Sequence, residues 1–453
     1  MSALAGLLRA AGHAVTGSDE YVYPPGSTLM EELGIPVLPG YDPARLEGVD
    51  LVVCGNAVGR TNPEAEAATA RGLRVLSLPA ALDELFLRGR SPLVVAGTHG
   101  KTTSAAMLAW VLERCGRAPG FLVGGVPRDL GRSFALGGER WFVVEGDEYD
   151  SAYFDKEPKF LHYRPEMLLL TAVEFDHADI YADLEHVKKA FGKLLAIVPP
   201  GAPLVACGDF PHLVDVVRQC GREGARYFGL GDENDWRVTD LRDDGLTRFT
   251  VRERGRAVGR VALRSPGAIN ARNALGVLLL ALEARVGWDE AVAALAEFRG
   301  VRRRQEVVAE ARGVTVVDDF AHHPSAVAGT LAALRLRYPG RRLRAVFEPR
   351  SNTSRRRVFQ REFVDALAAA DEAIVSQVFA KASDPIPPEE RLAPDALARD
   401  LRAHGRPARV LDGAPAIRDY LAESARPGDV IVIMSNGAFG GLPALVASGL
   451  GAA

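Results

Sequence analysis

Short apolar runs alternate with helical stretches along the first part of the chain. Residues 1–10 carry apolar side chains at helical spacing, and the next apolar run begins at 14–16. Further runs follow at 35–37, 50–54 and 74–76. This alternation of helices and short strands is typical of a small parallel sheet covered by helices.

The same rhythm resumes at residue 91 with more apolar strands. Four apolar runs between helical stretches predict buried strands at 93–96, 141–144, 167–171 and 204–207. Between residues 236 and 263 the pattern alternates and is rich in turns, which predicts an antiparallel meander at the edge of this domain. Helices are expected after it, at 271–285 and 289–298.

A third section follows a break in the apolar pattern. Gly300 and the charged run 302–304 are typical of a linker. Strands are expected after it at 314–317, 343–347, 372–375 and 429–434. The pattern therefore predicts an α/β protein with three domains, at residues 1–88, 89–300 and 301–453.

Composition narrows the class of protein. Hydrophobic residues make up 47% and charged residues 25% of the chain, which excludes a disordered or fibrous protein. A net charge of −3 provides no general positive field for nucleic acid or an anionic membrane. The four cysteines lie far apart without C-x-x-C spacing, which argues against a zinc ribbon, a redox pair or a disulfide scaffold. Without a membrane span or a signal sequence, a cytoplasmic protein is expected.

The most specific motif follows the strand expected at 93–96. We call it the phosphate loop, and it consists of Gly97, Thr98, His99, Gly100, Lys101, Thr102 and Thr103. Backbone N–H groups at a helix N-terminus cradle phosphates, a lysine neutralises the β- and γ-phosphates, and a threonine hydroxyl can ligate Mg²⁺. Val95 stands where the general pattern has its first glycine. The alternative interpretation is a glycine turn followed by a surface lysine.

Acidic clusters follow the next two strands. The first is Glu145, Asp147, Glu148 and Asp150, and the second is Glu174, Asp176, His177 and Asp179. Ligands of open α/β sheets bind at the carboxyl ends of the strands, and carboxylate oxygens suit Mg²⁺. One such cluster alone is usually a solvated turn, and a lone histidine is usually structural. Two successive clusters beside the phosphate loop predict a metal site.

Two further groups suit a nucleotide. Asn270 and Asn273 lie three residues apart on one helix face, where their amides could meet a purine edge. Asparagine is also a frequent helix cap, so this signal is weak by itself. Asp318 and Asp319 end the strand expected at 314–317, where an acid could hold ribose hydroxyls.

Together these motifs resemble the Mur ligase family, the ATP-dependent amide-bond ligases of peptidoglycan synthesis. The resemblance covers essentially the whole chain, because the motifs occur in the order of the family: 97–103, 145–150, 174–179, Asn270 with Asn273, Arg304, and 318–324. Within the family, the chain is more similar to ligases that join L-Ala-γ-D-Glu-meso-diaminopimelate to UDP-N-acetylmuramate in peptidoglycan recycling than to ligases that add L-alanine. The residues that favour this reading are 159–165, 174–180, 348–353 and 434–441.

The resemblance implies a role for each domain. A Rossmann-like N-terminal domain would bind the UDP-sugar, and a central P-loop-type domain would bind ATP and Mg²⁺. A Rossmann-like C-terminal domain would bind the peptide. By the same resemblance Lys101 would contact phosphate, Thr102 and Glu145 one Mg²⁺, and His177 a second. The other implied nucleotide contacts are the phosphate loop, Asn270 and Asn273 at adenine, and Arg304 and Asp319 near phosphate and ribose.

Substrate contacts are expected in the two outer domains. The resemblance places Ser18, Asp19 and Asn56 near the uridine and sugar, and His322 among the substrate contacts. For the zwitterionic diaminopimelate end, side-chain chemistry favours a bidentate contact from Arg350, with Ser351 and Asn352 beside it. The implied partners are UDP-N-acetylmuramate and the murein tripeptide, without nucleic acid or membrane, for a monomer or weak homodimer.

The implied reaction follows from carboxylate chemistry. The lactoyl carboxylate of UDP-N-acetylmuramate must first be phosphorylated by ATP, because its oxygen is a poor leaving group. Lys101 and Mg²⁺ would neutralise charge on the phosphoryl group before the L-Ala amine attacks the acyl phosphate. His177 is expected to be a metal ligand rather than a general base. Ala172 and Ile269 stand where the family usually has Asn and His, each at a cost of about 1 kcal/mol in ATP affinity.

The opening of the chain departs from the family. Its members usually begin with a strand and a glycine-rich turn just ahead of the first helix, and here the helix at 2–10 follows Met1 directly. The N-terminal domain is therefore expected to lack its first strand and the N–H groups that bind the UDP pyrophosphate. We expect an internal start and weak binding of the UDP-sugar, restored by about 10 to 20 upstream residues.

Four alternatives remain open at this stage. The nearest is a UDP-N-acetylmuramate:L-alanine ligase. A P-loop switch or motor would use the same phosphate loop but would not depend on a small amine. A folylpolyglutamate-synthase-like ligase would lack a UDP-binding first domain, and a ligase-shaped protein could carry an inactive first site.

Overall fold

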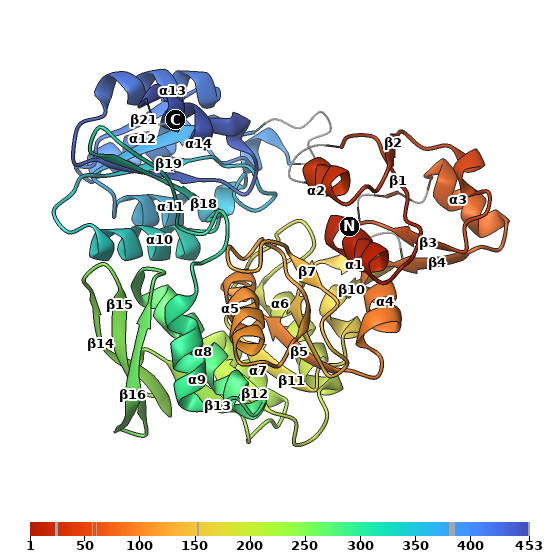
Figure 1. The fold of residues 1–453 in the computed structure, drawn as a ribbon. Helices are drawn as coiled ribbons and strands as arrows, with labels where there is room; N and C mark the ends of the chain where they lie inside the picture. Colours follow the sequence, from red (N-terminus) through yellow and green to blue (C-terminus); the bar gives the residue numbers. More distant parts are fainter. Residues whose placement is uncertain (23–25, 57, 60, 152–153, 380–385, 452–453) are drawn as a thin grey trace. The chain divides into compact units, whose positions relative to one another are not determined.

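The chain forms two compact units in a computed structural model, which describes all residues except 23–25, 57, 60, 152–153, 380–385 and 452–453 (Figure 1). The first unit contains residues 1–174, 184–234 and 276–294. The second contains residues 175–183, 235–275 and 295–453. The chain crosses from the second unit to the first within α8 (Gly267–Glu283) and returns within α9 (Trp288–Glu297). The domain boundaries expected near residues 88 and 300 stay predictions.

The N-terminal part of the first unit has short strands between helices. Its elements are α1 (Ser2–Ala10), β1 (Gly17–Asp19), α2 (Gly26–Glu32), β2 (Val37–Pro39), η1 (Pro43–Leu46), β3 (Leu51–Cys54), α3 (Pro63–Ala70), β4 (Arg74–Ser77), α4 (Leu78–Leu82) and η2 (Asp83–Leu87). The sequence predicts one small parallel sheet, but the described residues form two separate parallel pairs, β1 with β2 and β3 with β4. The strand expected at 14–16 instead begins at Gly17, so Ser18 and Asp19 lie within β1 rather than after it.

A mostly parallel sheet forms the centre of the first unit. Its strands in spatial order are β13 (Arg226–Gly229), β12 (Leu204–Cys207), β11 (Met167–Leu170), β5 (Ser91–Ala96), β8 (Trp141–Gly146), β6 (Gly120–Leu122) and β7 (Phe134–Ala135). The side chains of 93–96 are fully buried, which explains their unbroken apolar run. The chain leaves β5 toward β8 on one side and later returns to β11 on the other. The carboxyl end of β5 is therefore a switch point, where open α/β sheets bind ligands.

Helices and short segments complete this unit. They are α5 (Lys101–Arg114), α6 (Leu184–Ile197), α7 (Pro211–Gln219), η3 (Lys159–His162), β9 (Asp150–Ser151) and β10 (Asp155–Pro158). In α6, Val187, Phe191 and Leu194 follow helical spacing and are buried, which gives the helix one apolar face. No helix among the described residues is long and apolar enough to cross a membrane.

The antiparallel meander predicted between residues 236 and 263 is present. It consists of β14 (Trp236–Asp243), β15 (Thr247–Glu253) and β16 (Arg256–Leu263), paired in that order. These three strands end the strand order of the ten-stranded sheet that contains β5 and β8, as the prediction of an edge position requires, and their residues belong to the second unit. Arg337 of α10 (Pro324–Arg337) connects the meander to the rest of that unit, donating to Asp243 at 2.6 Å and to Arg264 O at 2.9 Å.

A six-stranded sheet organises the rest of the second unit. Its strand order is β17 (Glu306–Ala311), β18 (Val314–Asp319), β22 (Val430–Met434), β19 (Leu343–Phe347), β20 (Glu372–Ser376) and β21 (Ala408–Leu411). All neighbours are parallel except β17, which is antiparallel to β18. The predicted strands of this section are found, and β17 and β21 are additional.

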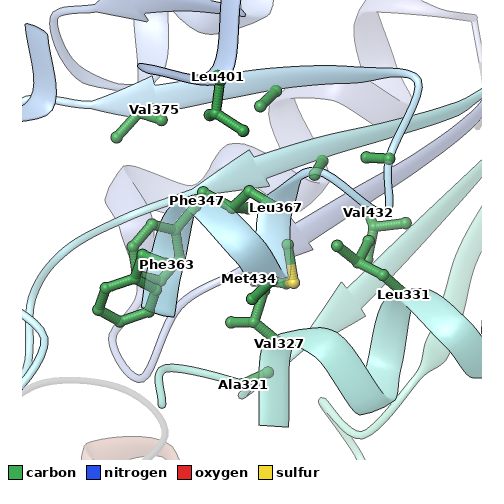
Figure 2. Packing of buried hydrophobic residues seen from close by; sticks show 14 of the residues in the cluster. Ala321, Val327, Leu331, Phe347, Phe363, Leu367, Val375, Leu401, Val432 and Met434 are labelled. Atoms are coloured by element: carbon green, nitrogen blue, oxygen red, sulfur yellow. The ribbon is translucent and has the colours of Figure 1, made fainter. Parts of the chain in front are cut away.

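Side chains of the central strands β18, β19, β20 and β22 point alternately to the two faces of this sheet. Phe347, Val375 and Met434 pack on one face with helices α10, α11 (Gln360–Leu367) and α12 (Pro394–Ala403) (Figure 2). Their sequence neighbours Val346 and Ile374 pack on the other face with α13 (Gly413–Ser424) and α14 (Leu442–Gly449). Because successive side chains point to opposite faces, strands covered on both sides are apolar throughout. The remaining short helices are η4 (Arg357–Phe359), η5 (Pro388–Glu390) and η6 (Phe439–Gly441).

Candidate active site

Two glycines with positive φ shape the phosphate loop between β5 and α5. Gly100 precedes the first residue of α5 with φ of +81°. Gly97 has φ of +140°, and a Cβ atom there would lie 2.2 Å from Thr171 Oγ1 and 2.7 Å from Ala172 N. Glycine is required at 97, because a methyl group would push the loop away from the neighbouring strand end. A helix that starts in this way presents backbone N–H groups that attract anions.

The carboxyl end of β11 holds the phosphate loop. Thr98 N donates to Ala172 O at 3.0 Å, and Glu174 N donates to Thr98 Oγ1 at 3.1 Å. Thr171 Oγ1 donates to Ala96 O at 3.2 Å and also to His99 O. His99 Nε2 lies 3.0 Å from Glu174 Oε2. Ala172 contributes through its backbone, so the replacement of the usual asparagine keeps this contact to the loop.

Lys101 forms a buried ion pair with Glu148. Its Nζ lies 2.9 Å from Oε1 and 2.8 Å from Oε2 of Glu148, whose side chain is fully buried. Burial lowers the pKa of Lys101, but the carboxylates of Glu148, Asp147 and Glu145 outweigh it, and the pKa lies above its usual value. Lys101 is therefore charged at neutral pH and is held at the start of α5.

Thr102 and Glu145 meet on the same side of the phosphate loop. Thr102 Oγ1 donates to Glu145 Oε1 at 2.7 Å, and Gly124 N donates to Glu145 Oε2 at 2.6 Å. A Cβ atom at Gly124 would lie 2.8 Å from that carboxylate, so glycine allows the close approach. A hydroxyl and a carboxylate side by side are the hard oxygen donors that Mg²⁺ prefers. These two residues therefore fit a magnesium ion.

A second ion pair lies in the same acidic turn. Lys159 Nζ is 2.6 Å from Asp147 Oδ2 and 5.7 Å from the centre of the Tyr149 ring. Burial raises the pKa of Asp147, but Lys159 and Lys101 outweigh it and hold the pKa below its usual value. The turn after β8 thus carries two lysine–carboxylate pairs around the phosphate loop.

The residues expected at the uridine and sugar are tied into the N-terminal part. Ser18 Oγ donates to Glu64 Oε1 at 2.8 Å and accepts from Arg45 at 3.2 Å. Asp19 accepts from Tyr21 N at 3.2 Å. Asn56 donates its amide hydrogen to Asp150 O at 2.6 Å, which connects the end of β3 to the acidic turn after β8.

The second unit carries the residues expected at adenine and ribose. Asn270 and Asn273 both lie buried in α8. Asn270 Nδ2 donates to Gln305 Oε1 at 2.8 Å, and Gln305 N donates to Asp319 Oδ2 at 2.7 Å. Burial raises the pKa of Asp319, although Arg304 opposes the shift. Asn270 and Asp319, far apart in sequence, are thus linked through Gln305.

Phe320 and His322 follow Asp319 in the chain. The guanidinium of Arg304 lies 4.6 Å from the centre of the Phe320 ring. His322 Nδ1 lies 2.9 Å from Phe320 O, and burial lowers the pKa of this histidine, so the neutral form dominates at neutral pH. His323, which the sequence did not single out, is the N-cap of α10 and accepts from Ser325 N at 3.4 Å.

The Arg350 side chain, after the carboxyl end of β19, is confined between the Phe379 ring and the backbone of Gly437. Its guanidinium carbon lies 3.8 Å from the centre of the Phe379 ring, and Nη1 lies 3.6 Å from Glu348 Oε1. A Cβ atom at Gly437 would lie 2.1 Å from Arg350 Nε. Ser351 Oγ, next in the chain, donates to Ser354 Oγ at 2.8 Å. Glycine at 437 and the phenyl ring of Phe379 therefore fix the direction of the Arg350 side chain.

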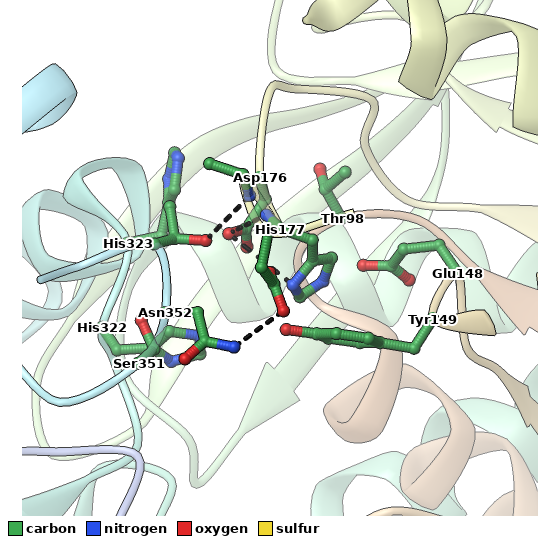
Figure 3. A network of polar contacts seen from close by, with 12 residues as sticks. Thr98, Glu148, Tyr149, Asp176, His177, His322, His323, Ser351 and Asn352 are labelled. Carbon is green, nitrogen blue, oxygen red and sulfur yellow. Dashed lines mark hydrogen bonds and ion pairs between the residues drawn. The ribbon is translucent and has the colours of Figure 1, made fainter. Parts of the chain in front are cut away.

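His177 belongs to the second unit, whereas Thr102 and Glu145 belong to the first. Its backbone N donates to Asp176 Oδ1 at 2.7 Å (Figure 3). Asn352 donates to Asp179 Oδ2 at 2.7 Å in the same segment. The metal-ligand role of His177 and the substrate role of Asn352 stay predictions.

Sequence profiles of three related domains match the chain in order. They are described as "Mur ligase family, catalytic domain" at residues 1–90, "Mur ligase middle domain" at 95–281 and "Mur ligase, glutamate ligase domain" at 303–437. A ligase of Escherichia coli K12 is 41% identical over 453 residues, covering 99% of this chain and 96% of its own. The chain belongs to the Mur ligase family. The predicted three-domain α/β Mur ligase architecture is thereby confirmed.

The names of the relatives of this Mur ligase differ in the amine substrate that is joined to UDP-N-acetylmuramate. The E. coli protein is a UDP-N-acetylmuramate–L-alanyl-γ-D-glutamyl-meso-2,6-diaminoheptandioate ligase. A UDP-N-acetylmuramate–L-alanine ligase of Symbiobacterium thermophilum is 37% identical over 450 residues, covering 96% of this chain and 89% of its own. The crystal structure of a murein peptide ligase of Psychrobacter arcticus matches with a TM-score of 0.71 and 34% identity, covering 100% of this chain and 96% of that one.

Several residues of the site could not be selected from the sequence. The sequence places Glu148 only in an acidic cluster and Lys159 only in the stretch 159–165. Their pairing with Lys101 and Asp147, and the contact of Gly124 with Glu145, follow from the folded structure. Gln305 follows Arg304 directly, but nothing in its residue type predicts a link between α8 and β18. Phe379 has no motif around it and is found only because the guanidinium of Arg350 lies on its ring.

Proposed function

We propose that this Mur ligase joins the tripeptide L-Ala-γ-D-Glu-meso-diaminopimelate to UDP-N-acetylmuramate, with ATP, in peptidoglycan recycling. The observation that carries the proposal is the 41% identity over nearly the full length to the E. coli ligase of that name. The buried Lys101–Glu148 pair and the adjoining Thr102–Glu145 pair support an ATP-dependent reaction at the phosphate loop.

The phosphate loop residues have separate tasks in this proposal. The α5 N-terminus and the phosphate loop would bind the nucleotide phosphates, and Lys101 would neutralise the phosphoryl group as it moves to the lactoyl carboxylate. Thr102 and Glu145 would hold one Mg²⁺ and His177 a second. When bound, Mg²⁺ would supply positive charge against the phosphate oxygens. Phosphoryl transfer to the lactoyl carboxylate would leave ADP, and attack of the L-Ala amine on the acyl phosphate would form the amide bond and release inorganic phosphate.

Residues of the second unit are proposed as further nucleotide contacts. Asn270 and Asn273 would face adenine, with Arg304 near phosphate and Asp319 near ribose. The link from Asn270 through Gln305 to Asp319 supports this assignment, because it ties the proposed adenine and ribose contacts together. Ser18, Asp19 and Asn56 are proposed for the uridine and sugar.

Arg350 would bind a carboxylate of the diaminopimelate end, with Ser351 and His322 among the neighbouring substrate contacts. A guanidinium held against Phe379 and over Gly437 is preorganised for a bidentate contact. Arg350→Ala should raise KM for the tripeptide by at least about tenfold, as expected for a hydrogen-bonded charged contact. Gly437→Ala should raise it too, because its methyl group displaces the same side chain. An unchanged KM in both variants would remove Arg350 from the site.

Phosphate release from ATP tests the proposed function directly. The full chain is incubated with UDP-N-acetylmuramate and ATP, with tripeptide in one reaction and L-alanine in another. We expect phosphate release with tripeptide and much less with L-alanine. Release with neither amine would reject ligase activity.

The second candidate is the L-alanine ligase reaction. The relative from S. thermophilum is 37% identical to this chain, which is close to the 41% identity of the E. coli ligase that supports the first candidate. Release with L-alanine but not with tripeptide would establish this alternative.

A further inference from the structure

The segment that carries His177 depends on other parts of the protein for its shape. Residues 171–183 contain no helix or strand, and 175–183 belong to the second unit. His177 has φ of +55°, a conformation that residues with a side chain adopt at a cost of about 1 kcal/mol or more. Its carbonyl oxygen accepts from Ile180 N at 2.9 Å and from Tyr181 N at 3.0 Å. Such a backbone persists only where surrounding contacts hold it.

The C-terminal region holds the beginning of this segment. The Phe175 side chain packs against the buried cluster of α10, α11 and α12, with its ring centre 6.0 Å from that of Phe359. His323 Nε2 lies 3.1 Å from Phe175 O. Because His323 Nδ1 accepts from Ser325 N, Nε2 carries the proton and donates to that carbonyl.

The same region holds the segment after His177. Thr353 Oγ1 accepts from Ala178 N at 3.3 Å, and Asn352 Nδ2 donates to Asp179 Oδ2 at 2.7 Å (Figure 3). The second bond joins an amide to an exposed carboxylate, and its short length is typical of a charge-assisted bond. His177 thus lies between an anchor at 175 and two anchors at 178 and 179.

Asn352 is itself fixed on its other side. Its Oδ1 accepts from Arg355 Nη2 at 3.3 Å, and the Arg355 side chain is fully buried. Arg355 Nη1 also donates to Phe379 O at 3.4 Å. Phe379 is the residue whose ring contacts the guanidinium of Arg350. The peptide-side arginine and the His177 segment are therefore both attached to residues 350–355.

We propose that Asn352 is a positioning residue, which holds His177 through Asp179 and so connects the peptide-binding end of the second unit to a metal ligand. The inference rests on the proposed function for the identity of the metal and the peptide. In this role Asn352 is not a substrate contact, because both polar ends of its side-chain amide bind protein groups. Partners of metal ligands usually change metal affinity or activity by about 10- to 100-fold when removed.

Four variants of the full chain test this role. Asn352→Ala and Asp179→Ala each remove one end of the bond, and their double variant completes a mutant cycle. Glu390→Ala is the matched control, since it removes an exposed ion pair with Arg356 in the same unit. Each protein is measured by hydrogen exchange of residues 171–183 without ligand, and by titration with Mn²⁺ in the presence of a non-hydrolysable ATP analogue.

The expected result has three parts. Exchange in residues 171–183 becomes faster in both single variants and not in the control. The affinity for Mn²⁺ falls by about tenfold in each single variant. The double variant binds Mn²⁺ no more weakly than the weaker-binding single variant, because both substitutions remove the same hydrogen bond. In active enzyme, KM for the tripeptide changes by less than about twofold, within the small effect expected of a residue that makes no contact with the peptide.

Two results would overturn the proposal. One is unchanged Mn²⁺ affinity in Asn352→Ala, and the other is a rise in KM for the tripeptide that Asp179→Ala does not share. A wild-type protein that releases phosphate with neither amine would reject the proposed function alone. The exchange and Mn²⁺ measurements would still decide the role of Asn352.

Discussion

At the scale of single residues, the site depends on buried charges that compensate one another. Lys101 and Glu148 are an example, since neither would be stable in its place as an isolated ion. The pair keeps the lysine charged and aimed before any nucleotide binds. A phosphate that binds at the α5 N-terminus therefore meets a cation already in position, which lowers the cost of ordering the site.

Removing Glu148 should destabilise the first unit. Glu148→Ala leaves Lys101 buried without its nearest carboxylate, and breaking a buried pair costs about 3 to 5 kcal/mol. We expect the lower end of that range, because Asp147 and Glu145 also face the lysine. Thermal unfolding should show the loss, and Glu148→Gln should show less of it. Glu157→Ala breaks an exposed pair with Lys193 and serves as the control; an equally small effect in both would contradict this account.

Asp318 should make stability depend on pH. Burial raises its pKa to about 6, with Arg303 opposing the shift and Asp319 adding to it. The folded protein then holds this proton more tightly than the unfolded chain, where the pKa is about 4. The resulting stabilisation is complete below about pH 4 and is lost as the pH rises to about 6, roughly 3 kcal/mol for two pKa units.

Asp318→Asn removes this titration and tests the sign. The melting temperature of the variant relative to wild type should increase between pH 4 and pH 7, because only the wild type loses the contribution. The attraction of Arg303, whose Nε lies 3.2 Å from Asp318 Oδ2, acts on the ionised carboxylate and is already contained in the pKa of about 6, so it does not change the sign of this trend. A difference that does not change with pH would show that the carboxyl titrates normally.

At the scale of elements, strand ends supply almost every group of the site. β5, β8 and β11 end side by side, and their following residues hold the phosphate loop, Glu145 and Glu174. In the second unit β18, β19 and β22 end together in the same way, and bring Asp319, Glu348 and Ser435 to one edge. Parallel pairing, rather than any single motif, gathers residues that are distant in sequence.

Gly97→Ala tests the fit between the phosphate loop and β11. The new methyl group would lie 2.2 Å from Thr171 Oγ1 and 2.7 Å from a backbone nitrogen, so the loop must move. We expect the dissociation constant for ATP to rise by more than about tenfold, the effect of losing one or two N–H contacts to a charged group. Gly224→Ala is the control, because a Cβ atom there meets nothing within 4 Å. Equal ATP affinities in the two variants would refute the requirement for glycine.

At the scale of the whole molecule, the proposed ATP contacts are divided between the two units. Lys101, Thr102 and Glu145 belong to the first, and Asn270, Arg304 and Asp319 belong to the second. The assignment of the adenine side can therefore be tested separately from the phosphate side.

Hydrogen exchange with saturating ATP analogue should show protection in both units. We expect slower exchange in residues 97–103 and also in 266–273 and 303–320. Ligand at about 100 times its dissociation constant stabilises the bound state by about 2.7 kcal/mol, which is large enough to detect. Protection confined to residues 97–103 would contradict the adenine and ribose assignments.

The sequence predicts the strands and the polar residues at their ends, but not the contacts those residues make. The phosphate loop and most long strands are found because apolar runs and glycines carry local information. The two separate strand pairs of the N-terminal part are missed, because pairing partners are not encoded in short runs such as 35–37. Asn352 and Lys101 find their partners, Asp179 and Glu148, on other segments of the chain. A single sequence does not say which side chains of separate elements come together.

The second unit also assembles from three separate stretches of chain. Phe175 fills part of the cluster beneath α10, α11 and α12, and Asp243 of the meander binds Arg337. A fragment that begins at residue 301 would lack both and would expose the apolar surface that Phe175 covers. Such a fragment should aggregate. Producing the second unit by itself would therefore require joining its three stretches into one chain, rather than a single cut.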